Sequence, residues 1–80
     1  MKNLVKVERV RRNIQQQDLA RILGVSRQSI YAMEGGRYDP SALLILKIAA
    51  LFNMKIEELF FLEETDMGFL REYEKNINKE

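Results

Sequence analysis

The pattern of apolar and polar residues along the chain predicts short helices joined by turns. Apolar side chains return every three or four positions near residues 4–12, 16–23 and 27–34, from 42 onward, and again at 56–60. This is the period of an amphipathic helix. No stretch alternates apolar and polar residues long enough to favour a sheet. We therefore expect an all-α fold in which residues 1–62 form a compact five-helix domain.

Residues with strong conformational preferences mark the ends of these helices. Gly24 follows the second helix, where a C-terminal cap commonly needs a positive φ. Ser26 is placed to cap the third helix through its hydroxyl, and Gly36 lies where that helix ends. Pro40 and Ser41 open the fourth helix, because proline is tolerated at a helix start and serine can cap it.

The helical period also indicates which side chains face the core. In the first helix we expect the inward residues to be Leu4, Val5 and Val7. In the fourth we expect a buried stripe made of Leu44, Ile48, Leu51 and Phe52. That fourth helix is apolar nearly all round, because it also carries Leu43, Ile45 and Ala50. Burial on more than one side is implied, and we expect the tail or a partner subunit to cover the extra face.

Residues 63–80 follow the predicted domain as a short C-terminal tail. Met67, Leu70 and Ile77 have nearly helical spacing, but Gly68 and the polar terminal run weaken the pattern. A helical tail and an irregular one both remain open.

Two aromatic residues stand side by side just before the tail. Phe60 and Phe61 cannot both point inward from one helical turn. We expect Phe61, with Leu62, to lie at a dimer contact.

Composition excludes several classes of protein. The chain has 80 residues and neither cysteine nor histidine, so we expect no disulfide, no structural zinc site, no metal and no cofactor. It has no glycine-rich phosphate loop and no evident pair of catalytic carboxylates, so we do not expect an enzyme or a small-molecule site. It lacks both an apolar run of about 20 residues and a signal-peptide pattern. We expect a cytoplasmic protein that does not enter a membrane.

The net charge of +1 conceals an uneven distribution. Residues 1–40 carry eight basic and four acidic side chains, a balance of +4, whereas residues 41–80 carry five basic and eight acidic ones, a balance of −3. Such asymmetry indicates an end that faces a polyanion. Charge alone leaves this interpretation and random scatter equally open.

Residues 16–37 have the layout of a helix-turn-helix. Ala20 is small enough to let two helices cross closely, and an apolar set would fill the space between them: Leu19, Leu23, Val25, Ile30 and Met33. The outward residues of the second of these helices are then Arg27, Gln28, Tyr31 and Ala32. Arginine pairs with guanine and glutamine with adenine in the major groove of DNA, so this face has the chemistry of a base reader.

Many residues in register make the chain similar to the helix-turn-helix family of phage repressors and Cro proteins, also called xenobiotic-response-element-like regulators. The resemblance covers about residues 3–62 and rests on Gln16, Leu19-Ala20, Leu23-Gly24-Val25-Ser26, Ser29-Ile30, Met33-Glu34, Gly36, Asp39-Pro40-Ser41 and Lys47-Ile48-Ala49. It implies a repressor-like five-helix domain that binds double-stranded DNA as a homodimer on a palindromic operator.

The resemblance also implies roles for individual residues. The DNA-binding set is Gln16, Arg27, Gln28, Ser29, Tyr31, Ala32, Arg37 and Tyr38. Among these, Gln16, Arg37 and Tyr38 would approach phosphates, and Arg27, Gln28 and Ala32 would face bases. Arg9 and Glu34 match a structural salt bridge between the first and third helices. Gln15 and Lys55 replace the usual capping residues of the second and fifth helices.

A second interpretation is a protein-interaction module, for instance an antitoxin-like protein whose acidic second half binds another protein. Such a module would not need Arg27 and Gln28 to face outward together. DNA binding that falls steeply with salt would favour the regulator, and little binding at either salt concentration would favour the module.

Overall fold

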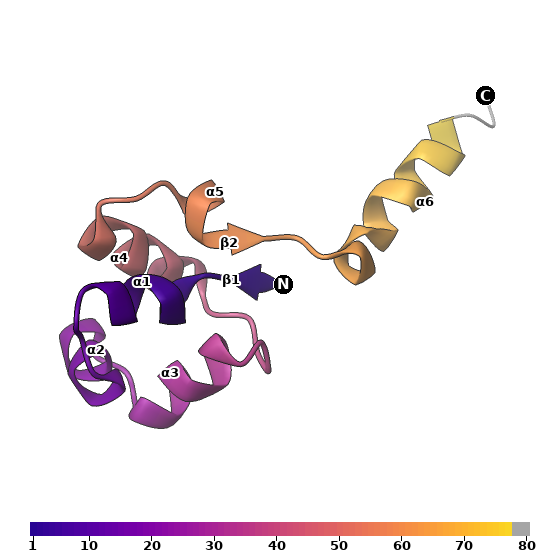
Figure 1. The fold of residues 1–80 in the computed structure, drawn as a ribbon. Helices are drawn as coiled ribbons and strands as arrows, with labels where there is room; N and C mark the ends of the chain where they lie inside the picture. Colours follow the sequence, from indigo (N-terminus) through magenta and orange to yellow (C-terminus); the bar gives the residue numbers. More distant parts are fainter. Residues whose placement is uncertain (78–80) are drawn as a thin grey trace.

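A computed structural model describes residues 1–77 of the chain. Within the predicted domain, five helices follow one another: α1 (Val5–Arg11), α2 (Gln16–Leu23), α3 (Arg27–Glu34), α4 (Ala42–Phe52) and α5 (Ile56–Leu59). Two short strands, β1 (Lys2–Asn3) and β2 (Phe60–Phe61), flank them, and a 3-10 turn η1 (Glu64–Met67) leads into α6 (Gly68–Ile77). Figure 1 shows α1 to α5 gathered together, with α6 projecting away from them.

The predicted helix boundaries are confirmed where capping chemistry sets them. Gly24 adopts the left-handed conformation at φ 75°, and the Val25 backbone N–H donates to the Ala20 carbonyl at 3.0 Å. The Ser26 hydroxyl accepts from the Ser29 backbone N–H at 3.0 Å. Ser41 caps α4 in the same way. Gln15 and Lys55 make no side-chain cap bond, as their replacement of a capping residue predicts.

The first helix is rotated relative to the prediction. Val5 is fully buried, but Leu4 and Val7 are exposed, so their predicted inward placement is wrong. Glu8 and Arg9 occupy the inward positions instead. Both form ion pairs there. The spacing of apolar residues in the sequence does not reveal charged side chains that are buried as ion pairs.

The fourth helix has the predicted stripe with one change. Leu44, Ile48 and Phe52 are buried, whereas Leu51 is exposed and Ala49 takes its inward place. The predicted burial of Leu51 is therefore wrong. The small side chain of Ala49 fits on the side of α4 that faces the core, and Leu51 points away from the core.

A two-stranded antiparallel sheet joins the two ends of the domain, which departs from the all-α prediction. Lys2 pairs with Phe61 and Asn3 with Phe60. Strands of two residues are too short to leave an alternating pattern in the sequence. Successive strand residues face opposite sides, so Phe60 is buried and Phe61 is 39% exposed.

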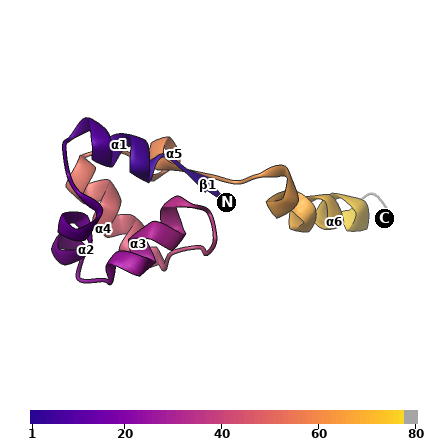
Figure 2. The ribbon, with the colours of Figure 1, turned by 60° about the horizontal axis from the view of Figure 1, so that its bottom comes forward.

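The tail continues as η1 and α6, and its last three predicted residues, 78–80, lie outside the described part. The ammonium group of Met1 contacts Asp66 at 3.0 Å and Glu63 at 3.2 Å, so it anchors η1 to the domain. Gly68 begins α6 with helical φ and ψ. No residue of α6 is buried, and the helix points outward in Figure 2. None of the helices in residues 1–77 has the length and apolar character needed to cross a bilayer.

Candidate nucleic-acid interface

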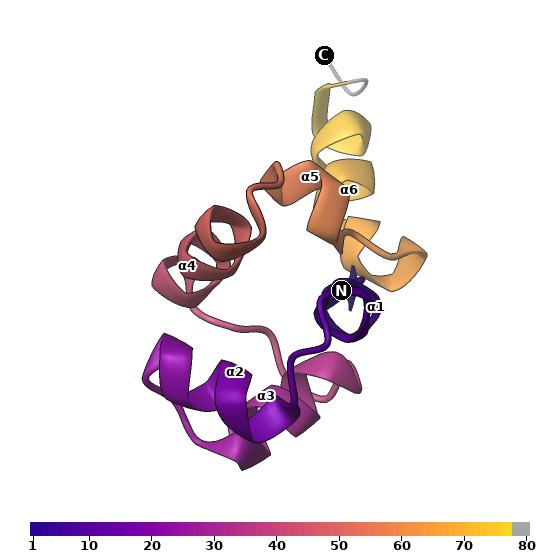
Figure 3. The ribbon, with the colours of Figure 1, turned by 60° about the vertical axis from the view of Figure 1, so that its left-hand side comes forward.

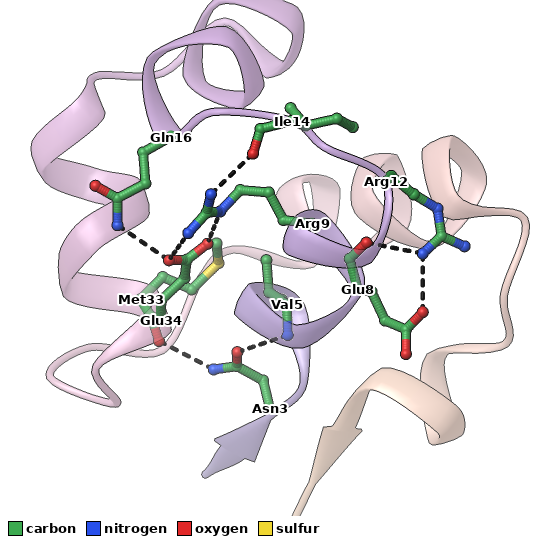
Figure 4. Close-up of polar contacts among 9 residues, drawn as sticks. All are labelled: Asn3, Val5, Glu8, Arg9, Arg12, Ile14, Gln16, Met33 and Glu34. Atoms are coloured by element: carbon green, nitrogen blue, oxygen red, sulfur yellow. Dashed lines mark hydrogen bonds and ion pairs between the residues drawn. The ribbon is translucent and has the colours of Figure 1, made fainter.

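A buried ionic network joins α1, α2 and α3 (Figure 4). The Arg9 guanidinium donates to both carboxylate oxygens of Glu34, at 2.7 Å and 3.1 Å. The Gln16 side-chain amide donates to the same carboxylate at 3.0 Å, and Arg9 also donates to the Ile14 carbonyl at 2.8 Å. The Arg9 and Glu34 side chains are only 9% and 3% exposed. The network fixes the end of α3 against the start of α2.

A second polar link ties β1 to the end of α3. The Asn3 side-chain amide donates to the Met33 carbonyl at 2.9 Å, and its oxygen accepts from the Val5 backbone N–H at 3.1 Å. One side chain thereby joins the sheet, α1 and α3. No pattern in the sequence predicts this bridge, because it depends on the strand pairing.

Close packing sets the angle between α2 and α3, which lie against each other in Figure 3. Ala20 is buried in α2, with 4% of its surface exposed. Leu19, Ile30 and Met33 are fully buried beneath it. The predicted apolar filling of the helix-turn-helix is confirmed.

The outward face of α3 presents the residues predicted to read bases. Arg27, Gln28 and Tyr31 are exposed, and Ala32 is half-buried. Ser29 is also half-buried, and its hydroxyl shares a hydrogen bond with the Ser26 hydroxyl at 2.9 Å. Three long polar side chains therefore stand free on a helix whose opposite side is locked in the core.

The loop after α3 folds back beside this face. Gly36 adopts a positive φ of 72°, and the Arg37 backbone N–H donates to the Ala32 carbonyl at 2.9 Å. The Arg37 guanidinium then lies over the Tyr31 ring, 5.2 Å from its centre, in a cation–π contact. Arg37 and Tyr38 are both exposed.

Two shallow depressions flank Gln16. One has a volume of about 250 Å³ and is lined by Lys6, Gln16, Tyr31, Glu34, Gly35 and Arg37. The other has a volume of about 300 Å³ and is lined by Arg9, Gln15, Gln16, Gln17 and Arg27. Lys6 and Gln17, which are not in the predicted set, therefore lie beside its members. Only the packing of α1 beside α3 distinguishes Lys6 from the other lysines.

The arginines divide according to where they lie. Five form ion pairs with carboxylates of the chain: Arg9, Arg11, Arg12, Arg21 and Arg71. Among residues 1–77, Arg27 and Arg37 make no such pair. The two uncompensated guanidinium groups both belong to α3 and its following loop, so this face offers positive charge to a partner.

The remaining predicted residues, Phe61 and Leu62, lie elsewhere. Both are exposed at the end of the domain, where β2 leads toward the tail. No cluster of three potential metal-ligating side chains exists in the described part of the chain.

Comparisons with known proteins agree with these features. A family model described as helix-turn-helix matches residues 5–59. An uncharacterised HTH-type transcriptional regulator of Methanocaldococcus jannaschii is 54% identical over 54 residues, which cover 68% of this chain and 82% of that protein. The ImmF control region 10 kDa protein of Bacillus phage phi105 is 37% identical, over 64% of this chain and 57% of its own.

A solved structure has the same fold. The crystal structure of a restriction-modification controller protein from Aeromonas hydrophila superposes with a TM-score of 0.63 at 28% identity. The match covers 70% of this chain and 85% of that one. The family match ends at residue 59, before η1 and α6.

Proposed function

The chain belongs to the helix-turn-helix family of Cro/C1-type DNA-binding transcriptional regulators, and we propose that it binds a palindromic operator as a homodimer and represses transcription. One observation carries the proposal. The exposed face of α3 holds a row of free polar side chains, and the chain's two guanidinium groups without a carboxylate partner in residues 1–77 both lie there.

The dimensions of α3 suit the major groove. An α-helix with its side chains is about 10–12 Å across, and the groove of B-form DNA is about 12 Å wide. Arg27 stands at the first turn, where it would pair with guanine O6 and N7, and Gln28 beside it would pair with adenine N6 and N7. Tyr31 and Ala32 follow one turn later, within reach of base edges or a thymine methyl. Ser29 would contact the DNA less directly, because its hydroxyl is hydrogen-bonded to the hydroxyl of Ser26.

Phosphate contacts would hold the domain in register. Gln16 lines both depressions, and its bond to Glu34 fixes the direction of its amide. Arg37 and Tyr38 approach from the loop, and Lys6 lines the same depression as Arg37. Such contacts provide most of the affinity and make it depend on salt.

A palindromic site requires two copies related by a twofold axis, with reading helices roughly 34–36 Å apart. Phe61 and Leu62 are the residues that we assign to the contact between copies. Both are large apolar side chains exposed at the end of the domain.

Binding to a selected DNA sequence tests this function. A duplex pool with a randomised centre is enriched on the protein, and the affinity of the selected duplex is measured by fluorescence anisotropy at two salt concentrations. Arg27→Ala should weaken binding by about 1–3 kcal/mol, or roughly 5- to 150-fold. Arg21→Ala is the matched control, because Arg21 is exposed but paired with Asp18.

Two results would contradict the proposal. If the pool yields no enriched sequence, or if binding is absent at both salt concentrations, the domain is an interaction module rather than a reader of DNA. If Arg27→Ala and Arg21→Ala behave alike on the selected duplex, α3 does not enter the groove in the way described.

A further inference from the structure

The tail helix α6 has an apolar side that nothing in residues 1–77 covers. Phe69 is 63% exposed and Tyr73 is 61% exposed, and both lie on the same side of the helix as Leu70 and Ile77. The opposite side carries charged residues such as Arg71 and Lys75. Isolated helices shorter than about 12–15 residues are marginal in water. A ten-residue helix of this kind therefore needs a surface to pack on.

The outer side of α4 is a second uncovered apolar surface. Leu43 is 63% exposed and Leu46 is 55% exposed, and Ala50 is exposed between them and the end of the helix. These three residues follow an i, i+3, i+7 spacing, so they form one stripe. Lys47 lies at its edge. The small side chain of Ala50 leaves room for a ring to pack.

The two surfaces do not meet within one chain. Figures 1 and 2 show α6 extending away from the domain that contains α4. The contacts of the Met1 ammonium with Glu63 and Asp66 hold η1 in place, and η1 sets the direction in which α6 leaves. The chain thus carries an apolar arm and an apolar surface that are kept apart.

We propose that α6 packs on the Leu43–Leu46–Ala50 stripe of a second copy of this chain, and that the second copy returns the same contact. This exchange of arms rests on the homodimer of the proposed function and adds a second contact between the copies to the one assigned to Phe61 and Leu62. A twofold exchange is self-complementary and closed, so it stops at two copies.

The lengths and charges of α6 and α4 are compatible with this packing. Helices of ten and eleven residues extend about 15 Å and 17 Å, so one covers the other along its length. Glu74 flanks the apolar side of α6 and Lys47 flanks the stripe on α4. One orientation of the packed helices brings the acid and the base together at the rim.

The area is also sufficient. Phe and Tyr side chains remove about 150–250 Å² each from solvent when buried. Two arms, together with the leucines that they cover, would bury on the order of 1,200 Å², the lower bound of a stable interface. The buried side of α4 faces the core, so its stripe points away from the domain interior, and no stripe residue lines either depression beside Gln16.

Cysteine cross-linking tests the exchange, because the chain has no cysteine of its own. One batch of full-length protein carries Lys47→Cys and another carries Glu74→Cys, so the apolar residues of both surfaces stay in place. The proposal expects a disulfide-linked dimer when the two batches are mixed and oxidised, and little from either alone. Cross-linking of Glu74→Cys alone would show that two α6 helices pair with each other, and would overturn the exchange. A disulfide within one chain that carries both substitutions would show packing on the same chain, which also overturns the exchange.

The affinity of self-association gives a second readout. Tyr73→Ala should weaken dimerisation at least about thirtyfold in sedimentation equilibrium, as for a residue at the centre of an interface. Lys75→Ala, on the opposite side of α6, should leave it unchanged. Both variants should fold, because α6 has no buried residue. Equal dimerisation in the two variants would overturn the exchange. A wild-type dimer that binds the selected DNA in that case would leave the proposed function standing.

Discussion

The pair of Arg9 and Glu34 allows a test of how the reading helix is held. Glu34→Ala removes three hydrogen bonds to its carboxylate, two from Arg9 and one from Gln16. The Arg9 side chain, 9% exposed in the intact pair, then keeps the Ile14 carbonyl as its one remaining partner among the bonds drawn in Figure 4. Removing one member of a buried ion pair costs about 3–5 kcal/mol. The lower end applies, because Arg9 keeps the bond to Ile14.

A loss of about 3 kcal/mol is large for a domain of this size. It should lower the melting temperature by roughly 12–24 °C, since each kcal/mol shifts a small domain by about 4–8 °C. The measurement is thermal and urea unfolding of the full chain followed by circular dichroism. Asp18→Ala is the control, because it breaks an exposed pair with Arg21 that contributes less than about 1 kcal/mol.

A double variant separates the loss of the pair from the stranding of a charge. Replacing both residues with leucine removes the buried charge altogether, so it should cost less than Glu34→Ala alone. A loss from Glu34→Ala no larger than that from the Asp18→Ala control would show that no buried charge is stranded. A double variant less stable than both single variants would show the same.

Three further outcomes follow from the geometry. Gly24→Ala should cost about 1–2 kcal/mol of unfolding free energy because φ is 75° there, with no neighbour within 4 Å to add a clash. Gly68→Ala, at helical φ in equally open space, should instead raise the helicity seen by circular dichroism; equal losses at both glycines would contradict this. Ala20→Leu should cost about 1–3 kcal/mol by overpacking the contact of α2 and α3, and denaturation that shows no change would rule out the close approach. Hydrogen bonds to Asp66 from the Glu63 backbone and the Met1 ammonium lower its pKa below 3.8, and the contact with Asp66 raises the pKa of that ammonium above 8.0. The contact that anchors η1 is therefore fully present between about pH 4 and pH 8. It is lost as the pH falls through the lowered pKa of Asp66 or rises through the raised pKa of the Met1 ammonium. A Glu63 amide resonance that does not shift across either limit would contradict this.

Local chemistry explains which parts of the fold the sequence predicted. Gly24, Ser26 and Ser41 fix helix ends through bonds to neighbours within a few residues, so their roles can be assigned without the fold. The apolar filling of the helix-turn-helix follows from periodicity in the same way. The pairing of Arg9 with Glu34 spans 25 residues and came from the family resemblance instead.

The missed features depend on contacts between distant parts of the chain. The sheet of β1 and β2 pairs residue 2 with residue 61, and strands of two residues leave no pattern. The rotation of α1 buries Glu8, whose charge Arg12 and Arg11 neutralise. The hydrophobic periodicity of the sequence assigns a glutamate to the exposed side of a helix. Lys6 lies beside the candidate interface only because α1 packs next to α3. Contacts with residues distant in the sequence determine which way such side chains face, and the local sequence does not show those contacts.

The pairing of Lys2 with Phe61 brings the first and last segments of the regulator domain to the same place. A polypeptide that enters at β1 and leaves at β2 needs almost no added length to close the ring. The domain is therefore suited to circular permutation, with new ends opened in a surface loop, and to insertion as a module between two residues of a host protein.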